Sequence, residues 1–206
     1  MLSLLAALGA ALLTFAALAE DLVTGDPIVQ WDQRFAAWLH AHPNEPTTDV
    51  PRVVTEFGRV AFVTATTIAI DTGLALRRRL AEALLLVFAV LGAEDVNFAL
   101  KAIFRRERPS FPDPLASETS FSFPSGHSSV AIAFYGALAL VLARLLPRWR
   151  ARLALALAAA ALVAVIGLSR LYLGVHYLSD VLAGFAAGLA WFLICVLALV
   201  VHARRR

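Results

Sequence analysis

The side chains of this chain that could do chemistry gather in three short segments. The segments are KAIFRRERP (residues 101–109), FPSGHSS (123–129) and SRLYLGVHYLSD (169–180). They combine fixed cations with histidine, serine and aspartate, a set that suits binding an anion and moving a proton or a covalent group beside it. The sequence therefore predicts catalysis on a bound anion, provided that the fold brings the three segments together.

The first segment carries two cations, Lys101 and Arg108, seven residues apart. This spacing is two turns of helix, so both lie on one face if the helix continues as far as Arg108, and Pro109 would then end it. Two cations on one face form a site for a doubly charged anion, and arginine can hold phosphate oxygens in a fork. Charged loops are common at membrane surfaces, so this segment by itself is a weak signal.

The second segment has the features of a helix N-terminus. Pro124 suits the beginning of a helix, and Ser125 is a natural N-cap. Gly126 allows another group to approach the backbone closely. The free N–H groups of such a terminus bind anions, and His127, one position inside, is placed to give or take a proton. From these residues alone, a capped helix start with a solvated histidine is an equal alternative.

The third segment places His176 and Asp180 four residues apart, where a helix is expected to begin after a turn at Gly174. On one helix face the carboxylate reaches the imidazole, and the other ring nitrogen is then available as a nucleophile or a base. A structural His–Asp pair is the alternative. It would explain neither Arg170 nor the two other clusters.

The elements that must position these segments are membrane spans. Hydrophobic residues make up 60% of the 206 residues and the mean hydropathy is +0.76, values typical of a membrane protein. A spanning helix needs about 20 apolar residues, and six runs qualify: Leu2 to Ala19, Phe57 to Leu76, Leu80 to Leu100, Ser125 to Leu146, Leu153 to Leu173, and Leu178 to Val201. We therefore expect an all-α, six-span transmembrane bundle in which residues 1–206 form a single integral-membrane domain.

Arginine clusters indicate the orientation, because short loops rich in Arg or Lys stay in the cytoplasm. Three clusters share one side: Arg77 to Arg79, Arg144 to Arg152, and Arg204 to Arg206. Both termini are then expected in the cytoplasm, and the three polar segments at the outer face of the plasma membrane, toward the periplasm or the exterior. The basic residues from Lys101 to Arg108 break this rule, which favours anion binding there. The inner clusters supply most of the net charge of +3, so no nucleic-acid partner is expected.

A helix lying in the membrane interface is expected after the first span. Its apolar residues recur at helical spacing and polar residues fill the other face; the apolar set is Ile28, Trp31, Phe35, Trp38 and Leu39, and the polar set is Gln30, Asp32, Gln33 and Arg34. His40 and His42 follow, just before Pro43 and Pro46. Without a carboxylate or cysteine cluster beside them, they are better interpreted as exposed loop residues than as metal ligands.

Three further features have structural interpretations. Ala17-Leu18-Ala19 resembles a signal-peptidase site, but no basic residue precedes the apolar run, so a retained first span is expected. Cys195 has no partner for a disulfide and is interpreted as a packed small side chain. Glu94 shares a helix face with Lys101 by spacing, and we expect an ion pair that holds Lys101 in place.

Together the three segments resemble the motifs of the type 2 phosphatidic acid phosphatase family. Those motifs are a Lys followed seven residues later by Arg-Pro, then Pro-Ser-Gly-His, then Ser-Arg with a His six residues after the Arg and an Asp four further on. Here the positions are Lys101, Arg108 and Pro109; Pro124, Ser125, Gly126 and His127; and Ser169, Arg170, His176 and Asp180. No position departs from the pattern, and the expected spans match, so the resemblance covers essentially the whole chain.

The resemblance implies a lipid phosphatase that needs neither a metal nor another cofactor. His176 would attack phosphorus to form a phosphohistidine, Asp180 would support its charge, and His127 would protonate the departing oxygen. The phosphoryl oxygens would be held by Lys101, Arg108, Arg170 and the backbone N–H groups around Ser125 and Gly126. A lipid phosphate or diphosphate in the bilayer is the expected partner, with undecaprenyl diphosphate or a phospholipid phosphate preferred. The lipid and the oligomeric state are left open.

Other functions share some of these features. Vanadate-dependent haloperoxidases carry the same motifs, but they are soluble and larger. A transporter or binding protein for anionic lipid or phosphate, without hydrolysis, would use the same cations. Transporters place such sites near the membrane midplane or between repeats, and the sequence shows no repeat. A scaffold that had lost activity would be expected to lack His127, His176 or Asp180, and all three are present.

Overall fold

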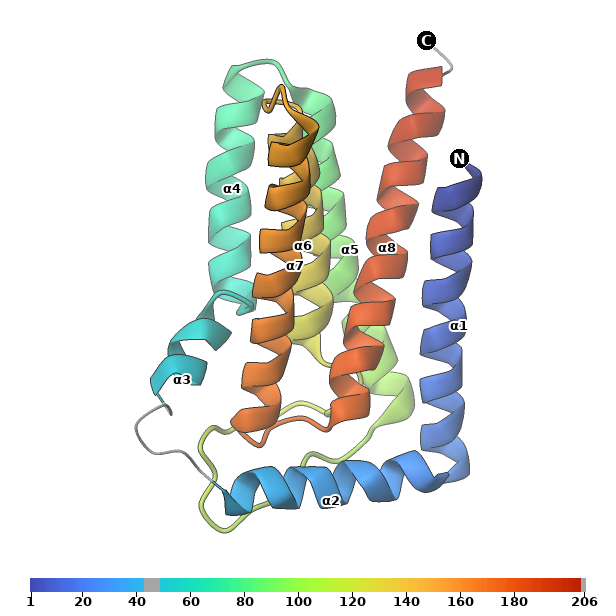
Figure 1. Cartoon of the computed structure of the whole chain (residues 1–206), viewed down its shortest axis with the longest axis vertical. Helices are drawn as coiled ribbons and strands as arrows, with labels where there is room; N and C mark the ends of the chain where they lie inside the picture. The colour runs from blue at the N-terminus through green and yellow to red at the C-terminus, as the bar shows by residue number, and fades with distance from the viewer. Residues whose placement is uncertain (43–48, 205–206) are drawn as a thin grey trace.

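The computed structural model describes residues 1–42 and 49–204, and in these ranges helices joined by turns and loops make up the whole structure (Figure 1). The helices are α1 (Leu2–Thr24), α2 (Pro27–Ala41), α3 (Asp49–Glu56), α4 (Val60–Leu76), α5 (Leu80–Phe104), α6 (Gly126–Ala143), α7 (Trp149–Tyr172) and α8 (Leu178–Arg204). The expected all-α class is confirmed. Four residues named above, Pro43, Pro46, Arg205 and Arg206, lie outside the described ranges.

Five helices of the described ranges are long and apolar enough to cross a membrane: α1, α5, α6, α7 and α8. The sixth expected span, Phe57 to Leu76, is not a single straight helix. Instead α3 and α4 meet at an angle of 43° and qualify as a span only as a bent pair. The protein is an integral membrane protein with six spans when this pair is taken as one.

The bend between α3 and α4 occurs where the chain passes very close to its neighbours. A Cβ atom at Gly58 would lie 2.6 Å from Ile166 Cγ2 of α7 and 3.3 Å from His127 Cδ2 of α6. A glycine is therefore required at this point, because any side chain would collide with α7. The bend thus brings the start of α4 against His127.

Small residues bring α6 and α8 together at the centre of the bundle. A Cβ atom at Gly184 would lie 2.5 Å from the carbonyl oxygen of Ser125, and one at Gly188 would lie 2.3 Å from that of Ser129. On its other side, α6 buries Val130, Phe134 and further apolar residues against α4 and α5. This close approach places the FPSGHSS segment beside the first turn of α8.

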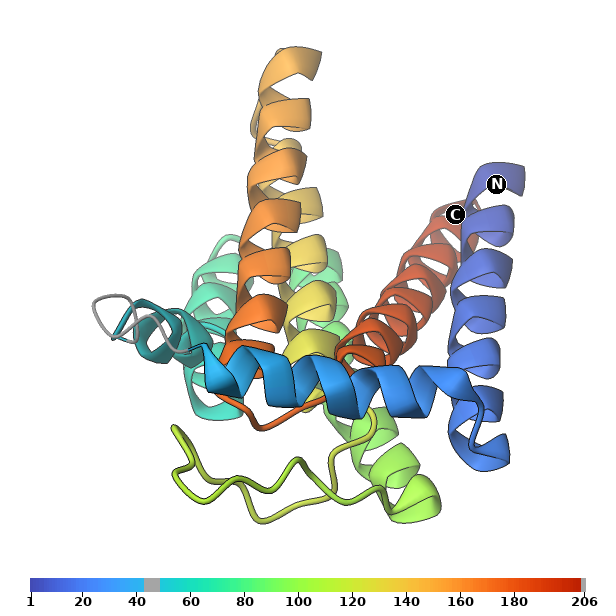
Figure 2. The same cartoon turned by 60° about the horizontal axis from the view of Figure 1, so that its bottom comes forward.

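The two ends of the bundle differ in what they carry. One end, which we call the arginine end, carries both termini and the short α4–α5 and α6–α7 connections, at the top of Figure 1. The other, which we call the α2 end, carries α2, the α3–α4 bend, the α7–α8 turn and the long connection of residues 105–125 (Figure 2). All three polar segments therefore lie at the α2 end, as the predicted topology requires.

Helix α2 runs across the α2 end, transverse to the spans (Figure 1). Trp31 and Trp38 are exposed along it, with 68% and 56% of their surface accessible, which suits tryptophan at a membrane interface. The expected interfacial helix is confirmed with one correction. Asp32, assigned to the polar outer face, is only 2% exposed and points into the protein, because it pairs with groups described below.

Candidate active site

The segment that was expected to continue α5 leaves the helix early. Helix α5 ends at Phe104, and Arg105 takes a left-handed conformation with φ of 47°. Lys101 and Arg108 therefore do not share a helix face, which corrects the expectation from their spacing. They meet by another route, since Lys101 Nζ and Arg108 Nη2 both donate to the carbonyl oxygen of Phe121. The cation pair is formed by the returning loop instead of by the helix.

The expected ion pair between Glu94 and Lys101 does not form. The side chain of Glu94 instead accepts a hydrogen bond of 3.4 Å from Thr64 Oγ1 of α4. Lys101 is held by the loop carbonyl, and its ammonium group faces the α2 end together with Arg108. Glu94 therefore joins α4 to α5 and takes no part in placing Lys101.

His176 has both ring nitrogens in contact with charged groups. Its Nδ1 lies 3.4 Å from Asp180 Oδ2, and its Nε2 lies 3.1 Å from Arg108 Nη1. The residue precedes α8 instead of lying on it, so the His–Asp pair forms across the helix start. Asp180, at the third position of the helix, also accepts a 2.8 Å hydrogen bond from the N–H of Tyr177, as in a capping box. One carboxylate thus caps the helix and orients the imidazole.

Burial shifts the pKa of His176 and of Arg108, two site residues that lie between the spans. It lowers the pKa of His176 to about 4, and the nearby Arg108 and Arg170 add to this, while Asp180 opposes it. Burial also lowers the pKa of Arg108. At neutral pH His176 is consequently uncharged, the form in which an imidazole nitrogen can act as a nucleophile.

The FPSGHSS segment turns into α6 as expected, but its donors are distributed differently. The backbone N–H of Ser125 donates to the carbonyl oxygen of Asp180 at 2.9 Å, and its side chain is buried and accepts from Ser128 Oγ at 3.1 Å. This N–H is therefore already bonded, and Ser125 joins two segments. The first turn of α6, beginning at Gly126, retains the N–H groups that lack helical partners.

Arg170 and His127 line one cavity of about 980 Å³ at the α2 end, beside the α3–α4 bend. Arg170 is 3% exposed; its Nη1 donates to Thr55 Oγ1 at 2.8 Å and its Nη2 to Glu118 Oε1 at 2.5 Å. Its Nε is buried with no hydrogen-bond partner among the described residues. A carboxylate and a free donor on one guanidinium show that this position suits an anion.

Several residues at this site were not assigned a role from the sequence. Thr55 and Glu118 contact Arg170, and Arg106 and Asp32 lie behind Asp180. Arg106 lies between Lys101 and Arg108 in the basic segment, and this position was the only indication in the sequence that it belongs to the site. Thr55 and Asp32 offered none, since each reaches the site from an element distant in sequence.

The two histidines expected in an exposed loop lie at the end of α2: His40 is half-buried within the helix, which corrects that expectation, and exposed His42 is its C-cap. His40 stacks on Phe111, with ring centroids 4.1 Å apart, and His42 Nδ1 lies 2.8 Å from the carbonyl oxygen of Trp38. Throughout residues 1–42 and 49–204, no group of three His, Cys, Asp or Glu side chains is placed to hold a metal ion.

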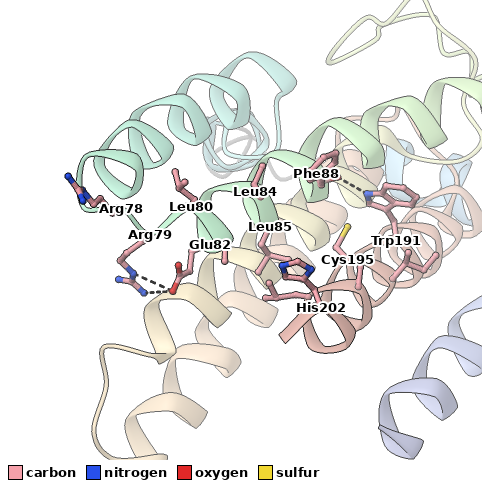
Figure 3. A pocket seen from close by; sticks show the side chains of 14 residues that line it. Arg78, Arg79, Leu80, Glu82, Leu84, Leu85, Phe88, Trp191, Cys195 and His202 are labelled. Atoms are coloured by element: carbon pink, nitrogen blue, oxygen red, sulfur yellow. Dashed lines mark hydrogen bonds and ion pairs between the residues drawn. The ribbon is translucent and has the colours of Figure 1, made fainter. Parts of the chain in front are cut away.

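A second cavity lies at the arginine end, between α5 and α8 (Figure 3). Its volume is about 930 Å³ and its walls are mainly apolar. His202 and Cys195 line it, and Figure 3 draws no interaction on either side chain. The interactions drawn are the ion pair of Arg79 with Glu82 and the hydrogen bond from Trp191 to the carbonyl oxygen of Phe88. It contains none of the residues of the three segments.

The chain is similar to proteins of known family. The model of the PAP2 superfamily matches residues 82–204, which include all three segments. Phosphatidylglycerophosphatase B of Bacillus subtilis (strain 168) is 37% identical over 140 residues, 68% of each chain. Lipid A 1-phosphatase of Rhizobium johnstonii is 38% identical over 128 residues, covering 58% of this chain and 47% of the relative.

Two solved structures are similar. The crystal structure of a transmembrane PAP2-type phosphatidylglycerolphosphate phosphatase from Bacillus subtilis superposes with a TM-score of 0.84 at 30% identity, covering 92% of this chain and 94% of that one. The crystal structure of LpxE from Aquifex aeolicus gives a TM-score of 0.62 at 19% identity, covering 81% and 94%. The second likeness concerns the fold alone.

The helical membrane bundle, the family model and these relatives together define the chain as a membrane-embedded phosphatase. This chain belongs to the PAP2 superfamily and is a lipid phosphatase of that family.

Proposed function

We propose that the protein hydrolyses a lipid phosphate or diphosphate through a phosphohistidine on His176. The observation that carries this is the pair of contacts on that ring, Asp180 on Nδ1 and Arg108 on Nε2. The carboxylate fixes the tautomer with the proton on Nδ1, so the lone pair of Nε2 is directed to the group that Arg108 holds. The nitrogen that would attack phosphorus, His176 Nε2, is thus in contact with the Arg108 guanidinium that would hold the phosphoryl group.

The reaction follows in two displacements. His176 Nε2 forms a bond to phosphorus as the bond from phosphorus to the lipid oxygen breaks, and His127 gives its proton to that oxygen. Asp180 stabilises the positive charge that develops on the His176 ring. A water then attacks phosphorus, His127 accepts its proton, and the P–N bond breaks to release phosphate and restore neutral His176.

The phosphoryl oxygens would be held by the cations and the start of α6. Arg170 supplies its Nε, which has no partner in the part of the chain that the structure describes, and Arg108 and Lys101 supply charge. The N–H groups from Gly126 onward supply the helix terminus. The Ser125 N–H would take part only if it left Asp180. This is the charge stabilisation that a metal supplies in many other phosphatases.

Glu118 would compete with the substrate for Arg170. Its carboxylate bonds Arg170 Nη2 at 2.5 Å and its side chain is one-third exposed. It belongs to the connection of residues 105–125, so it can swing outward without unfolding a helix. We expect a bound phosphoryl group to displace it.

The orientation that we propose places both termini in the cytoplasm and the α2 end at the periplasmic or exterior face of the plasma membrane. The basic connections at the arginine end and the tryptophans of α2 support this. The one domain, residues 1–206, would take its substrate from the bilayer, and undecaprenyl diphosphate and phospholipid phosphates such as phosphatidylglycerol phosphate are the preferred candidates.

The test is phosphate release by the purified protein in detergent with EDTA present, on undecaprenyl diphosphate, phosphatidylglycerol phosphate and phosphatidic acid. We expect release to survive EDTA, to differ among the lipids, and to be abolished in the His176→Ala protein. A wild-type protein that binds these lipids but releases no phosphate would instead support a binding or transport function. A His176→Ala protein as active as wild type would refute the nucleophile.

A further inference from the structure

A chain of buried charges continues behind His176 and ends on α2. Asp180 Oδ1 accepts a 2.6 Å hydrogen bond from Arg106 Nη1, and Arg106 Nη2 donates to Asp32 Oδ2 at 2.9 Å. The three side chains are 0%, 7% and 2% exposed. These are buried charges, for which the loss of one partner is far more costly than at a surface.

Ser179 and Tyr177 fix the guanidinium of Arg106 in this position. Arg106 Nη1 also donates to Ser179 Oγ at 2.7 Å, while the Ser179 N–H donates to Asp32 Oδ1 at 3.1 Å and its hydroxyl to Asp32 Oδ2. The guanidinium carbon lies 4.1 Å from the centroid of the Tyr177 ring. Arg106 therefore cannot reorient without breaking several bonds in a buried space.

The charges in this cluster have a consequence for His176. Two carboxylates share one guanidinium, so the cluster of Asp32, Arg106 and Asp180 carries one net negative charge. If Asp32 were absent, Arg106 would balance Asp180 alone and weaken its attraction for a positive ring on His176. If Arg106 were absent, Asp180 would lose the donor that holds Oδ1, and two carboxylates would be left unbalanced in a buried space.

We propose that Asp32 of α2 and Arg106 of the connection after α5 are positioning residues of the phosphatase reaction, holding Asp180 in place behind His176 and setting the charge that the histidine experiences. Neither contacts the substrate. Because this inference rests on the proposed function, its test needs one readout that depends on catalysis and one that does not.

The catalytic test compares Arg106→Gln and Asp32→Asn with two exposed controls, Arg105→Gln and Asp26→Asn, in the purified full chain. Arg105 adjoins Arg106, and its side chain bonds the local carbonyl of Ala102. Asp26 precedes α2 without capping it by its side chain. The quantities are kcat, KM and the pH at which kcat/KM falls on the acid side. One substrate is used throughout, so its own ionisation cancels between variants.

We expect kcat to fall about 10- to 100-fold in Arg106→Gln and less in Asp32→Asn, with KM within about threefold of wild type, because a charged hydrogen bond is lost away from the bound phosphate. The acid limb should move to higher pH in Arg106→Gln, where a positive charge is lost, and to lower pH in Asp32→Asn, where a negative charge is lost. A purely structural cluster would not move the two limbs in opposite directions.

Arg106→Lys tests geometry apart from charge. It should keep the acid limb at the wild-type position while kcat still falls, since an ammonium group cannot bond both carboxylates in the arginine fork. If Arg106→Gln does not fold, Asp32→Asn and Arg106→Lys decide the matter. The proposal is overturned if the folded variants keep kcat within about twofold of wild type, or if their acid limbs move in the same direction.

The readout that does not need catalysis is amide hydrogen exchange at Ser179, whose N–H bonds Asp32. Exchange there should be about tenfold faster or more in Asp32→Ala than in wild type and Asp26→Asn. Unchanged exchange would refute the hydrogen bond between Ser179 of α8 and Asp32 of α2. A wild-type protein that is inactive but protects Ser179 from exchange would refute the proposed function and, with it, the role of Asp32 and Arg106 in catalysis. The contact between Asp32 and Ser179 would then remain as a structural one.

Discussion

The two ends of the bundle hold similar side chains in different environments. At the α2 end, Arg106 is 7% exposed between carboxylates that are 2% and 0% exposed. At the arginine end, Glu82 bridges Arg79 and Arg144, whose side chains are 24% and 48% exposed. A histidine is present at each end, but His176 is fixed by two charged neighbours, whereas His202 lines an open apolar cavity (Figure 3).

The difference shows that residue type does not distinguish a functional cluster from a topological one. In the orientation proposed above, the arginines of the short connections at the arginine end would orient the chain through their number, which requires no fixed geometry. Arginines that contact a reacting group need a fixed geometry, and at the α2 end buried hydrogen bonds provide it.

Replacing one histidine at each end should give the largest contrast. His127→Ala should lower kcat about 10²- to 10⁴-fold, the range for loss of a general acid, while His202→Ala should leave kcat within about twofold. The defect should shrink on a phosphate ester with an activated leaving group, which departs without a proton. Steady-state assays on both substrates measure this. An equal defect on both would contradict the assignment of His127 as the acid.

The pH dependence should reflect the surroundings of His176. Since its pKa lies near 4, below the ordinary value of about 6.5, the ring stays neutral and nucleophilic as the pH falls through 6.5, and activity is lost only as the pH approaches 4. The groups responsible are the burial of the ring, Arg108 and Arg170, opposed by Asp180. The check is kcat/KM against pH, corrected for the second ionisation of the substrate phosphate. An acid limb near 6.5 would contradict it.

These expectations depend on features that the sequence revealed to different degrees. Spacing within a segment was sufficient to pair His176 with Asp180, because the contact is local. Spacing failed for Lys101 and Arg108, because α5 ends at Phe104 and a loop carbonyl brings the two cations together instead. Local periodicity cannot show how a returning loop is placed.

The contacts made between distant elements were not accessible from the sequence. Asp32 appeared to belong to the solvated face of an amphipathic helix, and only the packing of α2 against the start of α8 buries it. The spans were found by composition, but the break at Gly58 within the expected span was not, since its cause is a close approach to α7. Tertiary packing determines these positions, and no pattern in one segment records it.

Glu118 offers a smaller, opposite effect at the α2 end. In Glu118→Gln the carboxylate no longer competes for Arg170, so KM for the lipid phosphate should fall about two- to fivefold, the scale of an ion pair worth up to about 1 kcal/mol, with kcat unchanged. Inorganic phosphate should inhibit more strongly in parallel. Asp113→Asn, an exposed acid of the same connection, is the matched control. A rise in KM would show that Glu118 assists binding.

The smallest effect is expected for Glu82→Gln at the arginine end. It removes the pairs with Arg79 and Arg144, and because both arginines are partly exposed although Glu82 is 12% exposed, each pair should contribute only about 1 kcal/mol. The thermal midpoint should therefore move only slightly, and kcat and KM should not change. A loss of activity here would mean that the two ends are coupled and that the contrast drawn between them is wrong.

The proposed mechanism depends on a covalent bond between His176 and phosphorus, and this bond can be trapped. Purified protein is mixed with a radiolabelled lipid phosphate, quenched within the first turnover under alkaline conditions that preserve phosphohistidine, and the labelled peptide is identified by mass spectrometry. We expect an acid-labile phosphoryl group on His176 that is absent from His176→Ala. Turnover with no label on His176, or with label on another residue, would contradict the account.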